Sequence, residues 1–256
     1  MRLSSFTERL DDRLRIDDFT EVDASANGLQ VGPPEMGVTH AAFAVDAAAG
    51  TIERAVEAGA DVLVVHHGVI WGDLERVTGR AYGRIAPLVK NDVALYVSHL
   101  PLDSHPELGN AAGIADLLGL AEREPFGYLG GPEPLGQRGR VDDPLSSDDF
   151  GRRLEAELDT GGQGVRVLDF GPDAIEEVAV LTGAGADALD EAIEAGADAF
   201  VTGEGKGRLY HEAREAGITV FLCGHYATET FGVERLQGLA EDWGLETTFV
   251  DCPTGL

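Results

Sequence analysis

The chain has 256 residues, of which 43% are hydrophobic and 25% charged, so it is long and apolar enough for one large α/β domain or two compact lobes. Asp and Glu number 46 against 19 Lys and Arg, which gives a formal net charge of −27. Because a surface this acidic repels phosphate backbones, the composition argues against a nucleic-acid-binding protein.

The basic residues are almost all arginines, since only Lys90 and Lys206 are lysines. An excess of carboxylates with almost no lysine is typical of a protein that works in molar salt, where the Debye length is only about 3 Å. At that ionic strength the repulsion among carboxylates is screened, and the hydrated acidic surface keeps the protein in solution. We therefore interpret the charge as adaptation to a halophilic cytoplasm.

No segment of the sequence resembles a targeting or membrane signal. The first residues, MRLSSFTERLDDRLR, carry acids where a signal peptide needs an apolar core. No apolar run approaches the roughly 20 residues of a membrane helix. The two cysteines, Cys223 and Cys252, allow one disulfide at most, which favours a reducing compartment. We expect a cytoplasmic protein with no membrane partner.

The predicted elements, in chain order, form two similar halves. The strands of the first half are 41–45, 62–65 and 93–97, and those of the second are 177–181, 199–202 and 219–223. Ala-Val-Glu-Ala-Gly-Ala-Asp at 55–61 and Ala-Ile-Glu-Ala-Gly-Ala-Asp at 192–198 each end a helix, with the glycine at a C-cap position. The first half carries eleven extra residues after His67. Each half is predicted as β-α-β-α-β followed by a helix, so the fold class is α/β with two related lobes.

Between the halves, residues 121–175 change character. The stretch 127–136 is rich in Gly and Pro and predicts turns. Ser146 is placed to cap a helix, and residues 165–168 predict a short strand. We place the lobe boundary in this region, with residues 1–125 in the first lobe and 126–256 in the second.

Histidines and acids gather where the predicted strands end, which is where α/β sheets bind ligands. Four of the seven histidines lie there, and the full set is His66, His67, His99, Asp103, Glu204, His225 and Glu229. Imidazole and carboxylate ligands suit zinc, iron or manganese, and a carboxylate can bridge two ions. His225 and Glu229 are four residues apart, so they share one face if that segment opens a helix. The sequence therefore predicts a metal site.

Each of these residues also has a structural alternative. A lone His-x-x-x-Glu pair is more often a contact on a helix surface, whereas tandem histidines after a buried strand are costly when unpaired. Glu204 is a carboxylate that supports a metal ligand, a base, or an acid stabilised at a helix N-terminus. The remaining candidates receive structural assignments: His40 on the surface, His105 in a loop or at a pocket rim, His211 on a helix and Cys223 in the core.

Five motifs follow one another along nearly the whole chain. They are Asn27-Gly28-Leu29-Gln30-Val31-Gly32, His66-His67-Gly68, residues 98–103 with Gly109-Asn110, Thr202-Gly203-Glu204 and residues 224–229. Together they resemble the NIF-three-like family, also labelled dinuclear metal-centre hexameric protein or GTP cyclohydrolase I type 2 homologue, in its short form without an inserted domain. The stretch Gly205-Lys206-Gly207 departs from the commoner family sequence, which leaves the specificity of the pocket open.

The resemblance implies one family domain with two divalent metal ions (zinc, iron or manganese) bound between its lobes. The implied metal ligands are His66, His67, Asp103, His225 and Glu229. Glu229 would bridge the two ions, with His67 and Asp103 at one ion and His66 and His225 at the other. The resemblance further implies a toroidal homo-hexamer whose metal sites face an interior cavity.

Two classes of function are compatible with this site. In a metal-dependent hydrolase, the ions turn water into a nucleophile that attacks carbon or phosphorus. Under the GTP cyclohydrolase label, attack opens the guanine imidazole ring at C8 and releases formate, with His99 or Glu204 as candidates for moving protons. No guanine-reading motif is present. The alternative is a hexamer that handles metal, as a chaperone or insertion protein, or acts as a regulatory adaptor without turnover.

Overall fold

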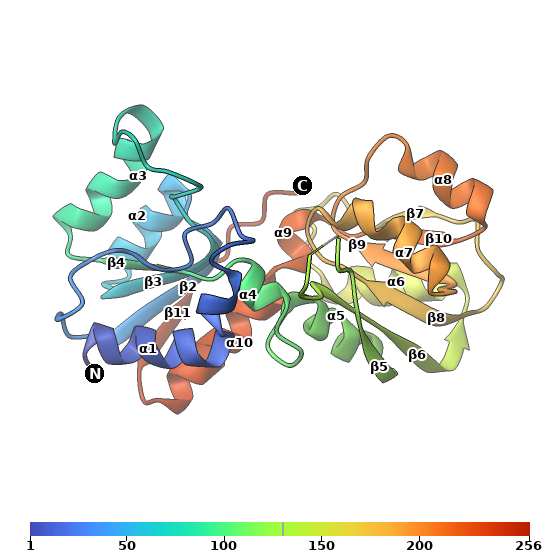
Figure 1. The fold of residues 1–256 in the computed structure, drawn as a ribbon, viewed down its shortest axis with the longest axis horizontal. Coiled ribbons are helices and arrows are strands. Elements are labelled where there is room, and N and C mark those ends of the chain that lie inside the picture. The colour runs from blue at the N-terminus through green and yellow to red at the C-terminus, as the bar shows by residue number, and fades with distance from the viewer. Residues whose placement is uncertain (130) are drawn as a thin grey trace. The chain divides into compact units, whose positions relative to one another are not determined.

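The computed structural model describes residues 1–129 and 131–256 and divides them into two α/β units, each with its own sheet (Figure 1). Unit 1 comprises Met1–Leu102 and Gly232–Cys252, and unit 2 comprises Asp103–Phe231 and Pro253–Leu256. The predicted α/β class with two related lobes is confirmed. Gly130, within the predicted turn-rich stretch 127–136, lies outside the described residues.

The division between the units differs from the boundary that the sequence predicted at residues 125 and 126. Residues 103–125 belong to unit 2 because β5 (Leu120–Phe126) pairs with β6 (Gly136–Leu145) in its sheet. The C-terminal segment returns to unit 1 because β11 (Glu246–Phe249) pairs in parallel with β2 (His40–Asp46). The pairing of β11 with β2 joins strands about 200 residues apart, which no local signal in the sequence announces. By contrast, β5 and β6 are consecutive antiparallel strands on either side of the predicted turn-rich stretch, so the predicted boundary separates the two strands of one hairpin.

Unit 1 contains a five-stranded sheet in the order β1-β4-β3-β2-β11. Its remaining strands are β1 (Gly28–Val31), β3 (Val62–His67) and β4 (Ala94–Val97). Its helices are α1 (Leu3–Leu14), the 3-10 helix η1 (Ile16–Phe19), α2 (Ala49–Glu57) and α3 (Gly79–Lys90), and the short α4 (Leu100–Asp103) and the long α10 (Thr230–Asp242) each cross the division between the units. Neighbouring strands are parallel except β1, which pairs antiparallel with β4.

Helices cover both faces of the unit 1 sheet, with α2 and α3 on one face and α1 and α10 on the other (Figure 1). The α2–α3 face is sealed by small and branched side chains, among them Ala42, Ala44, Ile52, Leu63, Leu88 and Leu95. On the α1 face, the fully buried Tyr96 donates its hydroxyl to Asp11 Oδ1 at 2.8 Å. Because successive residues of a strand point to opposite faces and both faces are covered, the interior positions of β2 and β3 are apolar, and their polar residues lie at the strand ends.

Unit 2 contains a six-stranded sheet in the order β5-β6-β8-β9-β10-β7. Its other strands are β7 (Arg166–Leu168), β8 (Ile175–Val180), β9 (Ala199–Thr202) and β10 (Thr219–Leu222). Its helices are α5 (Asn110–Leu118), α6 (Ser147–Glu157), the 3-10 helix η2 (Gly185–Ala188), α7 (Leu189–Glu194), α8 (Leu209–Ala216) and α9 (His225–Thr228). The predicted cap is confirmed, since the Ser146 side chain accepts a hydrogen bond from Asp149 N.

The unit 2 sheet is likewise covered on both faces. Val178 and Val180 pack with α5 and α6, whereas the intervening Ala179 packs with α7 and α8, which follows from the two-residue period of a strand. Cys223 is fully buried in the first of these clusters, as the sequence predicted. No helix of the described ranges combines the length and the apolar character needed to cross a bilayer.

The internal repeat predicted from the sequence appears as a repeated topology. β2, β3 and β4 are parallel neighbours joined through α2 and α3, and β8, β9 and β10 are parallel neighbours joined through α7 and α8. The repeat extends further upstream than the sequence showed, because β1 and β7 each add an antiparallel strand beside the third strand of their half. Gly59 and Gly196 follow α2 and α7 with φ of +73° and +74°, the left-handed conformation expected after a helix.

The aspartate that ends each repeated motif ties the helix–turn–strand unit to the preceding strand. Asp61 Oδ2 accepts hydrogen bonds from Thr39 N at 2.7 Å and His40 N at 3.0 Å. Asp198 Oδ2 accepts in the same way from Glu176 N and Glu177 N, each at 2.9 Å. Burial raises the pKa of Asp61, but the donors of Thr39 and His40 outweigh burial and hold the pKa below its ordinary value.

We predict that Asp61→Ala lowers the free energy of unfolding by roughly 1–3 kcal/mol near neutral pH, because two backbone N–H groups lose a charged acceptor. Since the pKa of Asp61 is depressed in the folded state, its contribution is present above the unfolded pKa and is lost as the pH falls through the folded pKa. Urea unfolding at fixed salt between about pH 7 and about pH 3 measures the difference.

Asp61→Asn is the matched control, because it keeps an acceptor oxygen and removes only the charge. We expect it to lose less stability than Asp61→Ala at neutral pH. A deficit of the alanine variant that stays constant down to acid pH would contradict the assigned role of the carboxylate.

Candidate metal centre

Three histidines of unit 1 lie together at the carboxyl ends of adjacent strands. His66 and His67 end β3, and His99 follows β4. Their ring centroids are 4.6 Å (His66–His67), 5.1 Å (His66–His99) and 5.6 Å (His67–His99) apart, and one nitrogen of each lies within 4.8 Å of the others. His66 is fully buried, and the other two are partly exposed. The three rings thus form one histidine cluster.

Every ring of the histidine cluster is held through Nδ1 by an acceptor. These acceptors are Ser98 O for His66, Asp46 Oδ1 for His67 and Asp23 Oδ1 for His99, each at 2.9 Å. A carbonyl or carboxylate oxygen only accepts, so Nδ1 carries the proton and Nε2 carries the lone pair. Metal-ligating histidines in proteins are oriented by this kind of partner.

Asp23 is the more enclosed of the two carboxylate partners, with 1% of its side chain exposed against 36% for Asp46. It also accepts hydrogen bonds from Leu100 N at 3.0 Å and Asn27 Nδ2 at 2.8 Å. Burial raises the pKa of Asp23, but the hydrogen bond and charge of His99, with the donor of Asn27, outweigh burial and hold the pKa below its ordinary value. Asp23 is therefore a fixed anion behind His99.

The motif at 27–32 holds the loops that carry the histidine cluster. Asn27 Oδ1 accepts from His99 N at 2.8 Å, and Gln30 Oε1 accepts from Val69 N at 2.9 Å and Ile70 N at 3.1 Å. The predicted turn into a strand is confirmed, since β1 begins at Gly28. The turn prediction did not reveal these contacts, which join segments about 40 and 70 residues apart in the chain.

Asp23 and Asp46 were not among the site residues predicted from the sequence. Asp46 ends β2 directly beside His67 in the parallel register, so the strand-end rule that selected the histidines would have found it. Asp23 precedes β1 and lies in a loop without a local pattern. Only the folded chain brings it to His99.

In unit 2, one histidine and two glutamates are linked. His225 Nε2 lies 3.2 Å from Glu229 Oε2, and His225 Nδ1 lies 2.5 Å from Glu204 Oε1. The predicted helical face is confirmed as the single turn α9, which places residues 225 and 229 on the same side. Glu229 is 4% exposed, whereas the Glu204 side chain is about half exposed.

Burial lowers the pKa of His225, but the hydrogen bonds and charges of Glu229 and Glu204 outweigh burial and raise the pKa to about 9. In the metal-free protein, the imidazolium therefore neutralises a buried carboxylate near neutral pH. A metal ion would supply the same positive charge and release this proton. Glu229 is therefore a buried anion whose charge is neutralised by protonated His225 in the absence of metal and would be neutralised by a metal ion in its presence.

Small residues make room for Glu229 in unit 2. A Cβ at Gly183 would overlap Glu229 Oε1, and Gly183 has φ of +59°, which few side chains adopt. Thr228 Oγ1 accepts from Gly183 N at 3.0 Å and fixes this loop against α9. The close approach of backbone to carboxylate leaves no space for a larger residue.

Asp103 contributes a second carboxylate in unit 2. Its Oδ1 accepts from Asn110 Nδ2 at 2.9 Å, which accounts for the Gly109-Asn110 part of the motif. One oxygen of Asp103 and one of Glu229 lie within 4.8 Å of each other. Two carboxylates this close repel unless a cation or proton lies nearby.

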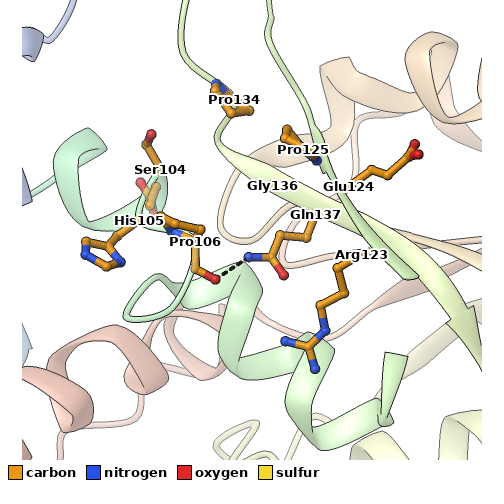
Figure 2. A pocket seen from close by; sticks show the side chains of 10 residues that line it. Ser104, His105, Pro106, Arg123, Glu124, Pro125, Pro134, Gly136 and Gln137 are labelled. Carbon is orange, nitrogen blue, oxygen red and sulfur yellow. Dashed lines mark hydrogen bonds between the residues drawn. The ribbon is translucent and has the colours of Figure 1, made fainter. Parts of the chain in front are cut away.

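A cavity of about 160 Å³ adjoins Asp103 in unit 2 (Figure 2). Gln137 Nε2 donates to Pro106 O at 2.7 Å in its wall, as Figure 2 shows. Gln137 Oε1 is buried and makes no hydrogen bond to any described residue. His105 also lines this cavity, in agreement with its prediction as a rim residue.

The other single candidates keep structural roles. His211 lies on α8, which confirms the predicted helix, and its side chain is exposed. His40 is buried rather than on the surface, because it begins the interior strand β2 and its Nε2 lies 2.9 Å from Thr248 Oγ1 of the paired β11. Burial raises the pKa of the Cys223 thiol well above its ordinary value, so this cysteine stays protonated.

The donor set fits divalent metal ions. Unit 1 offers three imidazoles whose Nε2 atoms are set by anchored Nδ1 atoms. Unit 2 offers one imidazole, at His225, and the carboxylates of Asp103 and Glu229. Imidazole with carboxylate is the chemistry that zinc, iron and manganese take in proteins.

Comparison with known proteins identifies relatives that match this chain over almost its whole length. A protein of Halobacterium salinarum, named GTP cyclohydrolase 1 type 2 homolog, is 60% identical over 256 residues and is covered completely, as is this chain. A protein of Treponema pallidum with the same name is 39% identical over 271 residues, covering 93% of this chain and 94% of the relative.

Solved structures agree with these relatives. The protein TTHA1606 from Thermus thermophilus superposes with a TM-score of 0.89 at 37% identity, and the protein ybgI, titled as of unknown function, with a TM-score of 0.90 at 35% identity; each comparison covers both chains completely. The model of the family described as Duf34/NIF3 (NGG1p interacting factor 3) matches residues 1–254. The chain therefore belongs to the Duf34/NIF3 family.

Proposed function

We propose that the protein binds two divalent metal ions per chain and is a metal-dependent hydrolase. The proposed ligands are His66, His67, Asp103, His225 and Glu229, with Glu229 bridging the ions, His67 and Asp103 at one ion, and His66 and His225 at the other. The observation that carries the proposal is the shared anchoring of the ligand histidines through Nδ1, which leaves Nε2 to face a metal.

When bound, the ions supply the positive charge that makes water a nucleophile near neutral pH. His99 is the residue that the proposal assigns to proton movement. Its Nδ1 is bonded to Asp23, so Nε2 is the atom that accepts and returns the proton. The pKa of Asp23 is held low, so its carboxylate stays charged and stabilises the imidazolium that forms.

Glu204 is the second candidate for moving a proton. Its carboxylate is about half exposed and is bonded to His225 Nδ1, so it can exchange protons with water. The same bond orients His225 as a ligand. Positioning of His225 and proton transfer are compatible roles for one carboxylate.

The names of the relatives direct the choice of substrate. If this chain acts as those names suggest, its substrate is GTP, the bond attacked is at C8 of guanine, and the product released is formate. The cavity beside Asp103 offers space next to a proposed ligand. The non-catalytic alternative, a metal-handling or regulatory protein, uses the same ligands and differs only in turnover.

We further propose a cytoplasmic homo-hexamer that works in high salt. The hexamer follows from the family resemblance of the motifs. The salt requirement follows from the net charge of −27 and the scarcity of lysine. In the hexamer, the sites of six chains would face a common cavity.

We predict that Glu229→Ala loses both metal ions, because the bridging carboxylate is shared by both. Elemental analysis of the purified protein gives metal per chain, and a melting curve verifies that the variant folds. Glu215→Ala, at an exposed position of α8, is the matched control and should keep both ions. Retention of two ions by Glu229→Ala would exclude the bridging role.

We predict that the metal-loaded protein releases formate from GTP and that Asp103→Ala reduces the rate by at least about 100-fold, since a ligand and its charge are lost. Enzymatic formate detection with and without added metal measures the reaction. Metal-loaded protein that releases no formate would shift the assignment to another substrate or to the metal-handling alternative, while the metal site would stand.

We predict that the melting temperature falls as KCl is lowered from about 3 M to about 0.1 M, because the Debye length grows to about 10 Å and the carboxylates repel one another. Sucrose in place of KCl is the control, since it does not screen charge. A melting temperature that is indifferent to KCl would rule out the adaptation inferred from the composition.

A further inference from the structure

A second cavity lies in unit 1, outside the proposed ligand set. Its volume is about 400 Å³, within the range of small-molecule sites. It is lined by Val69, Trp71, Thr78, Arg80, Ala81 and Arg84. These residues come from the segment after His67 and from the start of α3, the region in which the first half of the repeat carries its eleven extra residues.

This segment is basic in a chain that is otherwise strongly acidic. Residues 76–90 contain Arg76, Arg80, Arg84 and Lys90 and no Asp or Glu, whereas the whole chain has a net charge of −27. Arg80 and Arg84 are four residues apart on α3, so their charges lie on one helix face and repel each other. An anion between them would remove that repulsion.

Neither Arg80 nor Arg84 forms a hydrogen bond or ion pair with another residue in the described part of the chain. The corresponding helix of the other half is different. At its start, Arg208 pairs with Asp187 at 2.6 Å and approaches Glu212 at 3.8 Å. One copy of the repeat thus neutralises its arginine internally, and the other copy leaves two arginines at a cavity.

The start of α3 adds donors to the same cavity. Thr78 is the N-cap residue and its side chain makes no capping hydrogen bond. The first backbone N–H groups of a helix have no acceptor within the helix, and the helix dipole places partial positive charge there. Two guanidinium groups and a helix N-terminus together favour a multiply charged anion in this cavity. A guanidinium group can donate two parallel hydrogen bonds to phosphate oxygens, so phosphate suits this site.

Trp71 joins this cavity to the histidine cluster. Its ring centroid lies 5.0 Å from that of His99, edge to face, and 6.1 Å from that of His67. Its Nε1 donates to Gly68 O at 3.2 Å, which holds the indole beside the end of β3. A molecule whose phosphates occupy the cavity would therefore extend past Trp71 toward His99.

We propose that the cavity at Arg80 and Arg84 binds the phosphate groups of the substrate whose reacting end lies at the histidine cluster. The proposal rests on the proposed function in that it makes the substrate a phosphate-bearing nucleotide. Trp71 offers a planar face between the phosphates and the reacting ring.

The test measures binding of inorganic triphosphate and of GTP by titration calorimetry. The full-length protein is stripped of metal, so that chelation by bound ions does not contribute, and one KCl concentration is used throughout. The variant Arg80→Gln/Arg84→Gln is compared with Arg166→Gln/Arg214→Gln, which removes the same charge from exposed arginines of unit 2. We expect roughly tenfold or greater loss of affinity for both ligands in the first variant only.

Equal affinity of the two variants, or absence of triphosphate binding by the unmodified protein, would overturn the proposal. Metal content and formate release separate it from the proposed function. If Arg80→Gln/Arg84→Gln releases formate with an unchanged KM, phosphate binding at this cavity is excluded and the hydrolase proposal stands. If binding depends on the two arginines but GTP yields no formate, phosphate binding at the cavity is supported and the cyclohydrolase reaction is excluded.

Discussion

The candidate site depends on one constraint, which is the fixing of each strand-end histidine through Nδ1. A histidine at the end of a strand can rotate about two bonds, so its ligand atom is not set by the backbone alone. Ser98, Asp46 and Asp23 set that atom for the histidine cluster, and Glu204 does so for His225. Three of these four partners are carboxylates, so they also offset the charge that a histidine gains with a proton or a metal.

The repeated scaffold explains why the partners are available. The carboxyl ends of adjacent parallel strands lie at the same edge of a sheet, so the residues at the ends of β2, β3 and β4 lie close together. Asp61 and Asp198 tie the turns of the two halves in the same way, yet the edges have diverged. Unit 1 carries the histidine cluster and the cavity lined by Arg80 and Arg84, whereas unit 2 carries the carboxylates of Asp103 and Glu229 with the single imidazole of His225.

Charge separates the surface of the protein from its site. Among the 46 Asp and Glu residues, Asp23 and Glu229 have almost fully buried side chains that pair with histidines of the candidate site. Several exposed arginines pair with acids, as Arg140 does with Glu176. Arg80 and Arg84 have no acidic partner in the described part of the chain, and both line one cavity of unit 1.

The sequence by itself determined the α/β class, the repeat, the central strands and the strand-end histidines, because these follow from local periodicity and from one rule about parallel sheets. It could not determine that β11 returns to the first sheet, since pairing of distant strands has no local signature. It also placed the lobe boundary between β5 and β6, although these consecutive strands pair in the second sheet. Nor could it find Asp23 behind His99 or Gln30 beneath Val69. Those contacts join separate loops, and only tertiary structure brings such loops together.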